Sequence, residues 1–351
     1  MSVVGWDGVG LSAETAEALS ELAESALGGP VTDAGLLKGG ANNKVLKIVA
    51  EEKQYTAKIY FKHEHDSRDR LGAEFGFLTF AKKAGISCVP KAIAKDDRSG
   101  IGIYEYVDGA PFGTDATEGD VEEAARFFIE LNKTKEMSGG AALPDASEAW
   151  FRISDHIDCV ERRLDVLSGI GIESDLEAEV VRFVRGEAKA AFERAREYAF
   201  GKVKAAGIDL NCILEDESRC ISPSDFGFHN VIRRADGRLV FHDFEYAGWD
   251  DPAKTVCDFF CQPAVPAPTG MRKKLTEDLR NALRLGDDFS VRAEALFPVY
   301  RVKWVCIMLN VFLPAGRERR KFAQTEAAAP DIKTAQLEKA RRAIEYIDRS
   351  F

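Results

Sequence analysis

The spacing of the apolar residues changes at one point in this chain of 351 residues, and the change limits the folds that are open to it. In the first part, apolar residues form short runs with the alternation of β-strands, at 34–38, 44–50 and 54–61. After the turn Asp108-Gly109-Ala110-Pro111 the spacing becomes helical and stays so, except for a short interval at 220–243. The sequence therefore predicts an α+β fold with two lobes, a small antiparallel sheet followed by a larger, mostly helical lobe.

The N-terminal part also contains two predicted helices. Residues 12–27 have helical periodicity and are followed by Gly28-Gly29-Pro30, which stops a helix. A second helix is expected from about Ser67 to Ala84, and two further strands flank a turn at 96–100, the second of them ending at Val107. We expect a helical extension over residues 1–30 and a sheet lobe with one helix over 31–108.

The C-terminal part, residues 109–351, is expected to be a helical lobe interrupted by one β-rich interval at 220–243. A small sheet lobe joined to a larger helical lobe through one strand favours a ligand-binding cleft between two bodies. The predicted helices cover about 120–133, 148–168, 174–206, 252–262, 271–285, 290–313 and 331–348.

Composition and charge narrow the class of protein. A make-up of 45% hydrophobic and 30% charged residues is ordinary for a globular protein in water. The net charge of −10 argues against a nucleic-acid-binding surface. The N-terminus has no basic start followed by an apolar core, and the most apolar helix, Trp304 to Leu313, is too short to span a bilayer. We therefore expect neither nucleic acid nor a membrane as a partner, and the oligomeric state stays open.

The cysteines indicate a reducing compartment. There are 7 of them, an odd number, and none forms a Cys-x-x-Cys pair. This pattern is typical of reduced thiols in a cytoplasmic protein rather than of a disulfide framework. Cys257 and Cys261 lie one helical turn apart without the further ligands of a zinc site, so we interpret them as core residues.

The segment Ser222-Pro223-Ser224-Asp225-Phe226-Gly227-Phe228-His229-Asn230, followed by Val240-Phe241-His242-Asp243-Phe244-Glu245, carries the clearest chemical signal. It places an Asp and an Asn five residues apart and then a second Asp after an apolar run. Asp225 suits a base that takes or orients the proton of an acceptor hydroxyl. Asn230 and Asp243 supply the hard oxygen ligands that Mg²⁺ prefers. A turn or cap role explains Asp225 alone, but not the three ordered residues together.

Three other sets of residues suit a nucleotide. The turn containing Gly39, Gly40 and Asn42 lets backbone N–H groups approach phosphates, although such turns are also common without any ligand. Lys58 lies on the strand face opposite Ala57 and Ile59, and Glu74, in mid-helix, offers it a carboxylate partner.

For Lys58 taken alone, the alternative is a lysine that faces the solvent.

The third set lies on the strand predicted to lead to the second lobe. There the backbone carbonyl of Glu105 and the N–H of Val107 suit the binding of adenine. An ordinary buried strand at this position is compatible with that role.

In these residues the chain resembles the aminoglycoside phosphotransferase and choline kinase family, the small-molecule branch of the protein-kinase-like fold. Asp225 and Asn230 match its Asp-x4-Asn loop, and Asp243 to Gly248 followed by Asp251-Pro252 is close to its metal-binding stretch. The resemblance covers about residues 35–260. It implies ATP or GTP as phosphoryl donor, Mg²⁺ as cofactor and a small-molecule hydroxyl as acceptor.

The chain also departs from the family pattern. Pro223 and Ser224 stand where the family usually has His-Gly, a structural bracket for the metal-binding strand. Thr255 stands about where the family has a later Asp, and Asp258 follows one turn on, so we expect a structural or substrate-side role for Asp258.

The family resemblance places the acceptor over the helical lobe. Its candidate contacts are Asp250, Asp251, Tyr300, Arg301 and Trp304. Dominant carboxylates there favour an amine-bearing acceptor, whereas Arg301 with Lys303 favours an anionic one. Core packing of the helix that carries these bases is an equal alternative.

Two functions of different classes follow. The first is an ATP- or GTP-dependent O-phosphotransferase for an amino sugar, a sugar, or a choline-like or aminoglycoside-like acceptor. The second is a catalytically impaired nucleotide-binding regulatory module of the same fold, which the missing bracket histidine keeps open. Protein kinase or nucleotidyltransferase activity is less favoured, because no Ala-Pro-Glu-like segment follows Asp243.

Overall fold

The computed structural model of the chain describes residues 6, 9–37, 43–62, 68–136, 140–314, 316, 318, 322 and 329–347. The chain forms two compact units, and each is built from segments that are distant in the sequence. Unit 1 combines Met1–Pro111, Val231–Tyr246 and Glu318–Glu326. Unit 2 combines Phe112–Asn230, Ala247–Arg317 and Ala327–Phe351.

Unit 1 is organised by a five-stranded antiparallel sheet with the strand order β1-β2-β3-β5-β4. The hairpin between β2 and β3 turns through Glu51 and Glu52, which both have positive φ, at 48° and 60°. Two such residues form the tight turn whose twist matches that of antiparallel strands. The strands are β1 (Val31–Leu36), β2 (Lys44–Ala50), β3 (Lys53–Ile59), β4 (Ala92–Asp96) and β5 (Ile101–Glu105).

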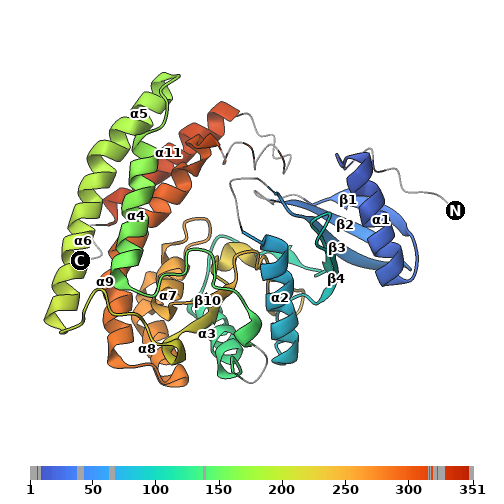
Figure 1. Cartoon of the computed structure of the whole chain (residues 1–351), viewed down its shortest axis with the longest axis horizontal. Coiled ribbons are helices and arrows are strands. Elements are labelled where there is room, and N and C mark those ends of the chain that lie inside the picture. Colours follow the sequence, from blue (N-terminus) through green and yellow to red (C-terminus); the bar gives the residue numbers. More distant parts are fainter. Residues whose placement is uncertain are drawn as a thin grey trace. The chain divides into compact units, whose positions relative to one another are not determined.

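The helix α1 (Ala13–Leu27) packs on one face of this sheet (Figure 1). The hydroxyl of Ser12 caps its first turn and the left-handed Gly28 ends it, which are the usual start and stop signals of a helix. Leu19 and Ala23 of α1 are fully buried in one apolar core with residues of the sheet. The sheet residues of this core are Leu46, Ile48, Ala57, Ile59, Ile101 and Ile103.

The helix α2 (Arg70–Lys83) supplies the group that meets the side of β3 bearing Lys58. Ala57 and Ile59 point into the core with α1, whereas Lys58 meets Glu74 of α2. The predicted alternation along β3 is therefore confirmed, because successive side chains of a strand point to opposite faces.

A second small sheet belongs to unit 1 although most of it comes from late in the chain. It pairs β6 (Ala110–Pro111) with β8 (Val231–Arg233), and β8 with β9 (Leu239–Phe241). The N–H of Phe241 donates to the carbonyl of Cys88 at 2.9 Å. The ring of Phe244 stacks on Phe77 of α2 with 4.3 Å between centroids. These contacts fix the segment that carries Asp243 within unit 1.

Unit 2 is mostly helical and is organised around α9, which contacts α4, α6, α7 and α11 (Figure 1). Its helices are α3 (Glu118–Lys133), α4 (Ile153–Ser168), α5 (Asp175–Phe183), α6 (Lys189–Ala205), α7 (Pro252–Cys261), α8 (Arg272–Leu283), α9 (Asp287–Leu309) and α11 (Ala329–Glu345). Short 3-10 turns lie at Gly140–Ala142, Asp216–Ser218, Phe228–Asn230, Thr269–Met271 and Asn310–Phe312, and a π turn lies at Val184–Ala188.

Within the described residues, Asp287–Phe312 is the one helical stretch long and apolar enough to cross a membrane. Of the most apolar 18-residue window in this stretch, 78% is buried inside the protein. Its neighbours in unit 2 account for that burial, so its composition is that of a core helix.

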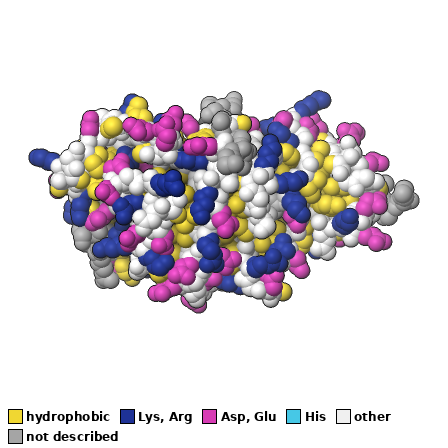
Figure 2. All heavy atoms as spheres, turned by 90° about the horizontal axis from the view of Figure 1, so that it is seen from below, with side chains coloured by type: hydrophobic (Ala, Val, Ile, Leu, Met, Phe, Trp, Pro, Cys, Tyr) yellow, Lys and Arg dark blue, Asp and Glu magenta, His cyan; other side chains and the backbone are white. Residues whose placement is uncertain are grey.

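On the face of the molecule seen in Figure 2, basic and acidic side chains are interspersed and do not gather into one field of a single sign.

A two-stranded ribbon in unit 2 leads into the loop with the Asp-x4-Asn pattern. It pairs β7 (Cys220–Ser222) with β10 (Gly248–Asp250). Asn132 of α3 binds both backbone groups of Ile221: its Oδ1 accepts from the N–H at 2.7 Å and its Nδ2 donates to the carbonyl at 3.0 Å. The start of the loop is thereby anchored to α3.

Two of the predicted helices differ from the sequence-based expectation by more than a few residues at their ends. The helix predicted over 148–168 begins only at Ile153: Glu148 has a φ of 54°, which a right-handed helix does not allow, and Arg152, directly before the helix, is extended with φ −112° and ψ 145°. The helix predicted over 174–206 is divided into α5 and α6 by the π turn at Val184–Ala188. Periodicity locates such segments well and their ends poorly.

The packing of α1 on the sheet leads to a stability prediction. Leu19→Ala removes a fully buried side chain from the core of unit 1 and is expected to lower the free energy of unfolding by about 2–5 kcal/mol. Glu21→Ala, on the exposed side of the same helix, should leave it nearly unchanged. Urea unfolding followed by circular dichroism measures both. Equal effects of the two substitutions would contradict the packing of α1 on the sheet.

Candidate active site

The central feature of unit 1 is a buried lysine held by two carboxylates. The Nζ of Lys58 on β3 lies 2.6 and 2.9 Å from the two carboxylate oxygens of Glu74 on α2. It also lies 3.0 Å from Oδ1 of Asp243, two residues beyond β9. Three of the residues predicted from the sequence therefore meet at one ammonium group.

Two tyrosines that the sequence-based prediction missed complete this arrangement. The hydroxyl of Tyr60 donates to Oε2 of Glu74 at 2.6 Å and lies 2.7 Å from the hydroxyl of Tyr104. Gly102 leaves room for that ring, since a Cβ at this position would lie 2.5 Å from the Tyr104 hydroxyl. The carboxylate of Glu74 is thus oriented from two sides.

The electrostatics keep Lys58 charged. Burial lowers the pKa of Lys58, but the carboxylates of Asp243 and Glu74 outweigh that effect and the net shift of the pKa is upward. Asp243 has a φ of 67°, in the left-handed region that residues other than glycine rarely adopt. Such backbone strain concentrates at functional sites, where the surrounding contacts maintain it.

A second buried carboxylate, Glu245, links this segment to Asn43, the residue directly before β2. Nδ2 of Asn43 donates to Oε2 of Glu245 at 2.7 Å, and Nε of Arg70 lies 3.7 Å from the same oxygen. Burial and the negative charge of Asp243 raise the pKa of Glu245 to about 7. Gly39, Gly40 and Asn42, predicted to approach the phosphates, lie outside the described residues.

The two residues predicted to bind adenine lie at the end of β5. Glu105 is the last residue of this strand, and its N–H donates to the carbonyl of Lys91 at 2.9 Å. Val107 is buried two residues further on. Their role in binding adenine stays a prediction.

The loop that carries Asp225 and Asn230 belongs to unit 2 and is held by its own hydrogen bonds. Nδ2 of Asn230 donates to the backbone carbonyl of Asp225 at 3.0 Å, and the Asn230 N–H donates to the carbonyl of Gly227 at 3.1 Å. Ser224 takes a φ of 64° just before Asp225. The side chain of Asp225 is 34% exposed, so its carboxylate is accessible to a ligand.

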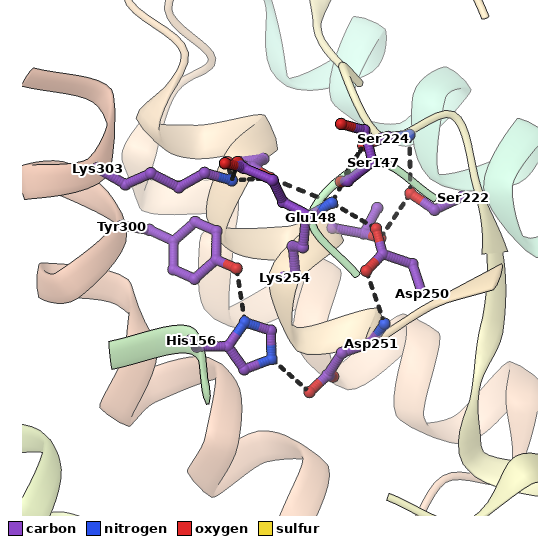
Figure 3. A network of polar contacts seen from close by, with 12 residues as sticks. Ser147, Glu148, His156, Ser222, Ser224, Asp250, Asp251, Lys254, Tyr300 and Lys303 are labelled. Atoms are coloured by element: carbon purple, nitrogen blue, oxygen red, sulfur yellow. Dashed lines mark hydrogen bonds and ion pairs between the residues drawn. The ribbon is translucent and has the colours of Figure 1, made fainter. Parts of the chain in front are cut away.

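Ser224, which stands where the family has the Gly of His-Gly, is held by residues of the helix α7 (Figure 3). The Oγ of Ser222 accepts from the N–H of Ser224 at 2.9 Å and from the hydroxyl of Thr255 at 3.0 Å. The Nζ of Lys254 donates to the Oγ of Ser224 at 3.1 Å. The left-handed Ser224 is therefore held in place without a bracket histidine.

Lys254 is itself a buried ammonium between carboxylates. It lies 2.5 Å from Oδ2 of Asp250 and 3.7 Å from Oδ2 of Asp258. Burial lowers the pKa of Lys254, but these two carboxylates outweigh it and the net shift is upward. Asp250, predicted to contact an acceptor, is fully buried in this pair.

Asp251 and Tyr300, also predicted acceptor contacts, meet at His156 (Figure 3). Asp251 pairs with the guanidinium of Arg292, and Nε2 of His156 lies 3.2 Å from its Oδ2. The hydroxyl of Tyr300 lies 2.7 Å from Nδ1 of His156. Burial raises the pKa of Asp251, yet Arg292 and His156 outweigh it, so the pKa lies well below its ordinary value.

The remaining acceptor candidates lie on α9. Nε1 of Trp304 donates to Oδ1 of Asp258 at 2.9 Å, and Lys303 lies 3.3 Å from Oδ2 of the same carboxylate. Lys303 also lies 3.6 Å from Glu148, which pairs with Arg163. The guanidinium of Arg301 stacks over the ring of Phe297 at 4.9 Å. Asp258 therefore has the structural contacts expected of it, and the acceptor role of these residues stays a prediction.

The structure thus groups the predicted residues into two sets. Lys58, Glu74 and Asp243 meet within unit 1, and Asp225 and Asn230 share a loop of unit 2. Over the described ranges, no cluster of three or more His, Cys, Asp or Glu is arranged to hold a metal ion. A cation bound by one Asn and one Asp, as predicted, does not require such a cluster.

Comparisons with known proteins agree with this geometry. The choline kinase LicA from Streptococcus pneumoniae superimposes with a TM-score of 0.56 at 16% identity, covering 95% of this chain and 99% of that one. Spectinomycin phosphotransferase APH(9)-Ia, solved with ADP and spectinomycin, gives 0.56 at 14% identity over 92% and 98% of the two chains. APH(2")-IIa, solved with gentamicin, gives 0.55 at 17% identity over 96% and 97%. No curated protein matches this chain in sequence.

These similarities confirm the predicted α+β, protein-kinase-like fold. The profile of the phosphotransferase enzyme family matches residues 33–267, which is more than half of the chain. The chain belongs to this family, and the protein is a phosphotransferase.

Several residues that support the site were not predicted from the sequence. Tyr60 gave a usable signal, since it lies two residues from Lys58 on the same strand face. Lys254 gave another, four residues after Asp250 at the start of a helix. His156 and Arg292 gave none, because they lie 95 and 41 residues from Asp251.

Removal of Asp251 tests its internal pairing. Asp251→Ala leaves the buried guanidinium of Arg292 without its carboxylate and is expected to lower the free energy of unfolding by about 3–5 kcal/mol. Asp278→Ala, which removes an exposed ion pair with Lys274, is the matched control and should have little effect. Urea unfolding measures both. A stable Asp251→Ala variant with a raised KM for the acceptor would instead support the predicted acceptor contact.

The buried Glu245 makes the stability of unit 1 depend on pH. Its folded pKa of about 7 lies above the ordinary 4.5, so the folded state binds more protons between these values. The contribution of Glu245 to stability is full below about pH 4.5 and is lost as the pH rises through 7.

We expect the Tm of Glu245→Gln to exceed that of the wild type at pH 8 by more than at pH 5. The glutamine keeps an oxygen for Asn43 and carries no charge to bury. Differential scanning fluorimetry at the two pH values measures this, with the exposed Glu24→Gln of α1 as control. A parallel pH dependence in wild type and Glu245→Gln would contradict the pKa shift.

Proposed function

We propose that the protein is an ATP- or GTP-dependent kinase that transfers a γ-phosphoryl group to a hydroxyl of a small metabolite. The observation that carries this proposal is the buried contact of Lys58 with both Glu74 and Asp243. A lysine held by a helix glutamate, beside a metal-binding aspartate, is the phosphate-gripping arrangement of kinases. The membership of the family supports the same reaction.

For the nucleotide, Lys58 grips the α- and β-phosphates, and the backbone N–H groups of Gly39, Gly40 and Asn42, which lie outside the described residues, are proposed to bind them as well. The backbone groups of Glu105 and Val107 bind the adenine. Glu74 acts through Lys58, because its carboxylate holds the ammonium in place.

Asn230 and Asp243 would hold Mg²⁺, which supplies positive charge to neutralise the phosphate oxygens. Asn230 fits this role in its orientation: its Nδ2 is used by the carbonyl of Asp225, and that leaves its Oδ1 for a cation. Asp243 is accessible to a cation, since its side chain is 33% exposed despite the contact with Lys58. Both are hard oxygen donors.

Asp225 takes or orients the proton of the acceptor hydroxyl. The hydrogen bonds from Asn230 and the strained Ser224 fix the backbone of the loop around it. The contacts of Ser224 with α7 argue against the catalytically impaired module as the alternative, because the loop is anchored although Pro223 and Ser224 replace the usual His-Gly.

The acidic pair Asp250 and Asp251, at the end of β10, does not favour an amine-bearing acceptor over an anionic one. Asp250 and Asp251 are fully buried and paired with Lys254 and Arg292, and Lys303 is paired with Asp258. The screen of acceptors therefore includes compounds with and without an amine. All 7 cysteines are free thiols, which supports a cytoplasmic enzyme.

A screen of acceptors with a mechanism-based control tests this function. ATP or GTP consumption with Mg²⁺ is measured against aminoglycosides, choline, ethanolamine, amino sugars, hexoses and homoserine. We expect turnover on at least one acceptor. Asp225→Ala should abolish turnover and leave nucleotide binding near normal, because the substitution removes only the proposed base. Asp243→Ala should also remove Mg²⁺-dependent nucleotide binding.

Asp236→Ala serves as the control, because Asp236 lies in an exposed turn of unit 1, pairs with Arg238 and is not one of the proposed site residues. Full turnover by Asp225→Ala would overturn the mechanism. Mg²⁺-dependent nucleotide binding without turnover on any acceptor would favour the regulatory module instead.

A further inference from the structure

His229 is a second ionisable group on the loop that carries the proposed base. Its Nε2 lies 3.2 Å from Oδ1 of Asp225, four residues earlier. The side chain of His229 is only 20% exposed, so the contact is partly shielded from water. The family pattern of this loop, Asp-x4-Asn, assigns no role to the position before the asparagine.

The position of His229 is fixed by both of its neighbours in the short turn Phe228–Asn230. The ring of Phe228 is fully buried and lies against Phe112 at 4.7 Å and Phe259 at 5.3 Å. Asn230 is tied to the carbonyls of Asp225 and Gly227. The backbone of His229 therefore has little freedom.

The imidazole also fits closely against the loop itself. A Cβ on Gly227 would lie 2.9 Å from Nδ1 and 3.1 Å from Cε1 of His229, so no other residue at position 227 leaves room for the ring. The same added atom would lie 3.3 Å from the side chain of Gln262, at the end of α7. Glycine at 227 is thus what allows the imidazole to face Asp225.

The surroundings of the ring select one tautomer. Nδ1 is buried and has no hydrogen-bond partner among the described residues. A hydrogen on Nδ1 would leave a buried N–H unpaired and would turn the lone pair of Nε2 toward the carboxylate, and both are unfavourable. The hydrogen therefore belongs on Nε2, which lies 3.2 Å from Oδ1 of Asp225.

We infer that His229 is a positioning residue for the base: its Nε2–H holds Oδ1 of Asp225 and so directs Oδ2 to the acceptor hydroxyl. This role rests on the proposed function. The proton of the acceptor hydroxyl passes to Oδ2 while its oxygen bonds to the γ-phosphorus and the bond to the β–γ bridging oxygen breaks. His229 keeps its proton throughout. A carboxylate with one fixed oxygen loses less freedom when it meets the acceptor.

The inferred hydrogen bond from Nε2 of His229 to Oδ1 of Asp225 can be tested independently of any turnover. The protein has 5 histidines, so ¹⁵N-histidine labelling gives few imidazole signals, and His229→Gln assigns the one in question. We expect His229 to be in the Nε2–H tautomer, with imidazole shifts that change in Asp225→Ala. An Nδ1–H tautomer, or shifts unaffected by Asp225→Ala, would overturn the inference.

The role in the reaction is tested by two substitutions of similar size. His229→Leu removes the donor, and kcat with the best acceptor of the panel should fall by about 10–100-fold, with the KM for nucleotide within about twofold. His229→Gln keeps an N–H donor and should retain kcat within about threefold.

The outcomes separate the two claims. Equal losses in His229→Leu and His229→Gln, or no loss in either, would overturn the positioning role. The Tm of both variants is measured as a control, and equal Tm values show that a difference in kcat does not come from a difference in stability. A wild type that is inactive on the whole panel would overturn the proposed function, and with it the catalytic role of His229, while the NMR result would still decide the hydrogen bond.

Discussion

Unit 1 depends on one interaction, the buried ammonium of Lys58 between two carboxylates. An ammonium is stable away from water only where such groups surround it, so the contact requires β3, α2 and the segment after β9 to meet. The register of β3 is part of this requirement. A slip of one residue would turn Lys58 into the apolar core under α1 and would bring Ala57 to Glu74.

Unit 2 uses the same physical principle for a different purpose. Lys254 is buried between Asp250 and Asp258, and through Ser224 it holds the loop before Asp225 in a left-handed conformation. Together with Asn132 at the other side of β7, it anchors the loop to two helices. Carboxylates that look in sequence like an acceptor site are thus engaged in keeping the proposed base in place.

The sequence allowed much of the fold to be predicted, because strand alternation and helical spacing are local properties. It placed Lys58 on the correct face of β3 and paired it with Glu74. It did not locate the start of α4, which follows a left-handed Glu148 and an extended Arg152, or the division between α5 and α6, which is a π turn. Tyr60 and Tyr104 were missed because hydroxyl partners are not specified by any spacing.

By itself, the sequence determined the order of the elements, the type of reaction and the residues that suit it, since Asp225, Asn230 and Asp243 form a pattern that can be recognised along the chain. Only the tertiary structure decided which charges neutralise one another. Asp251 meets Arg292 and His156, and Asp225 meets His229 across a loop that Gly227 keeps open. Electrostatic pairing falls off with distance in space, and spacing along the chain does not reveal that distance for residues brought together by folding.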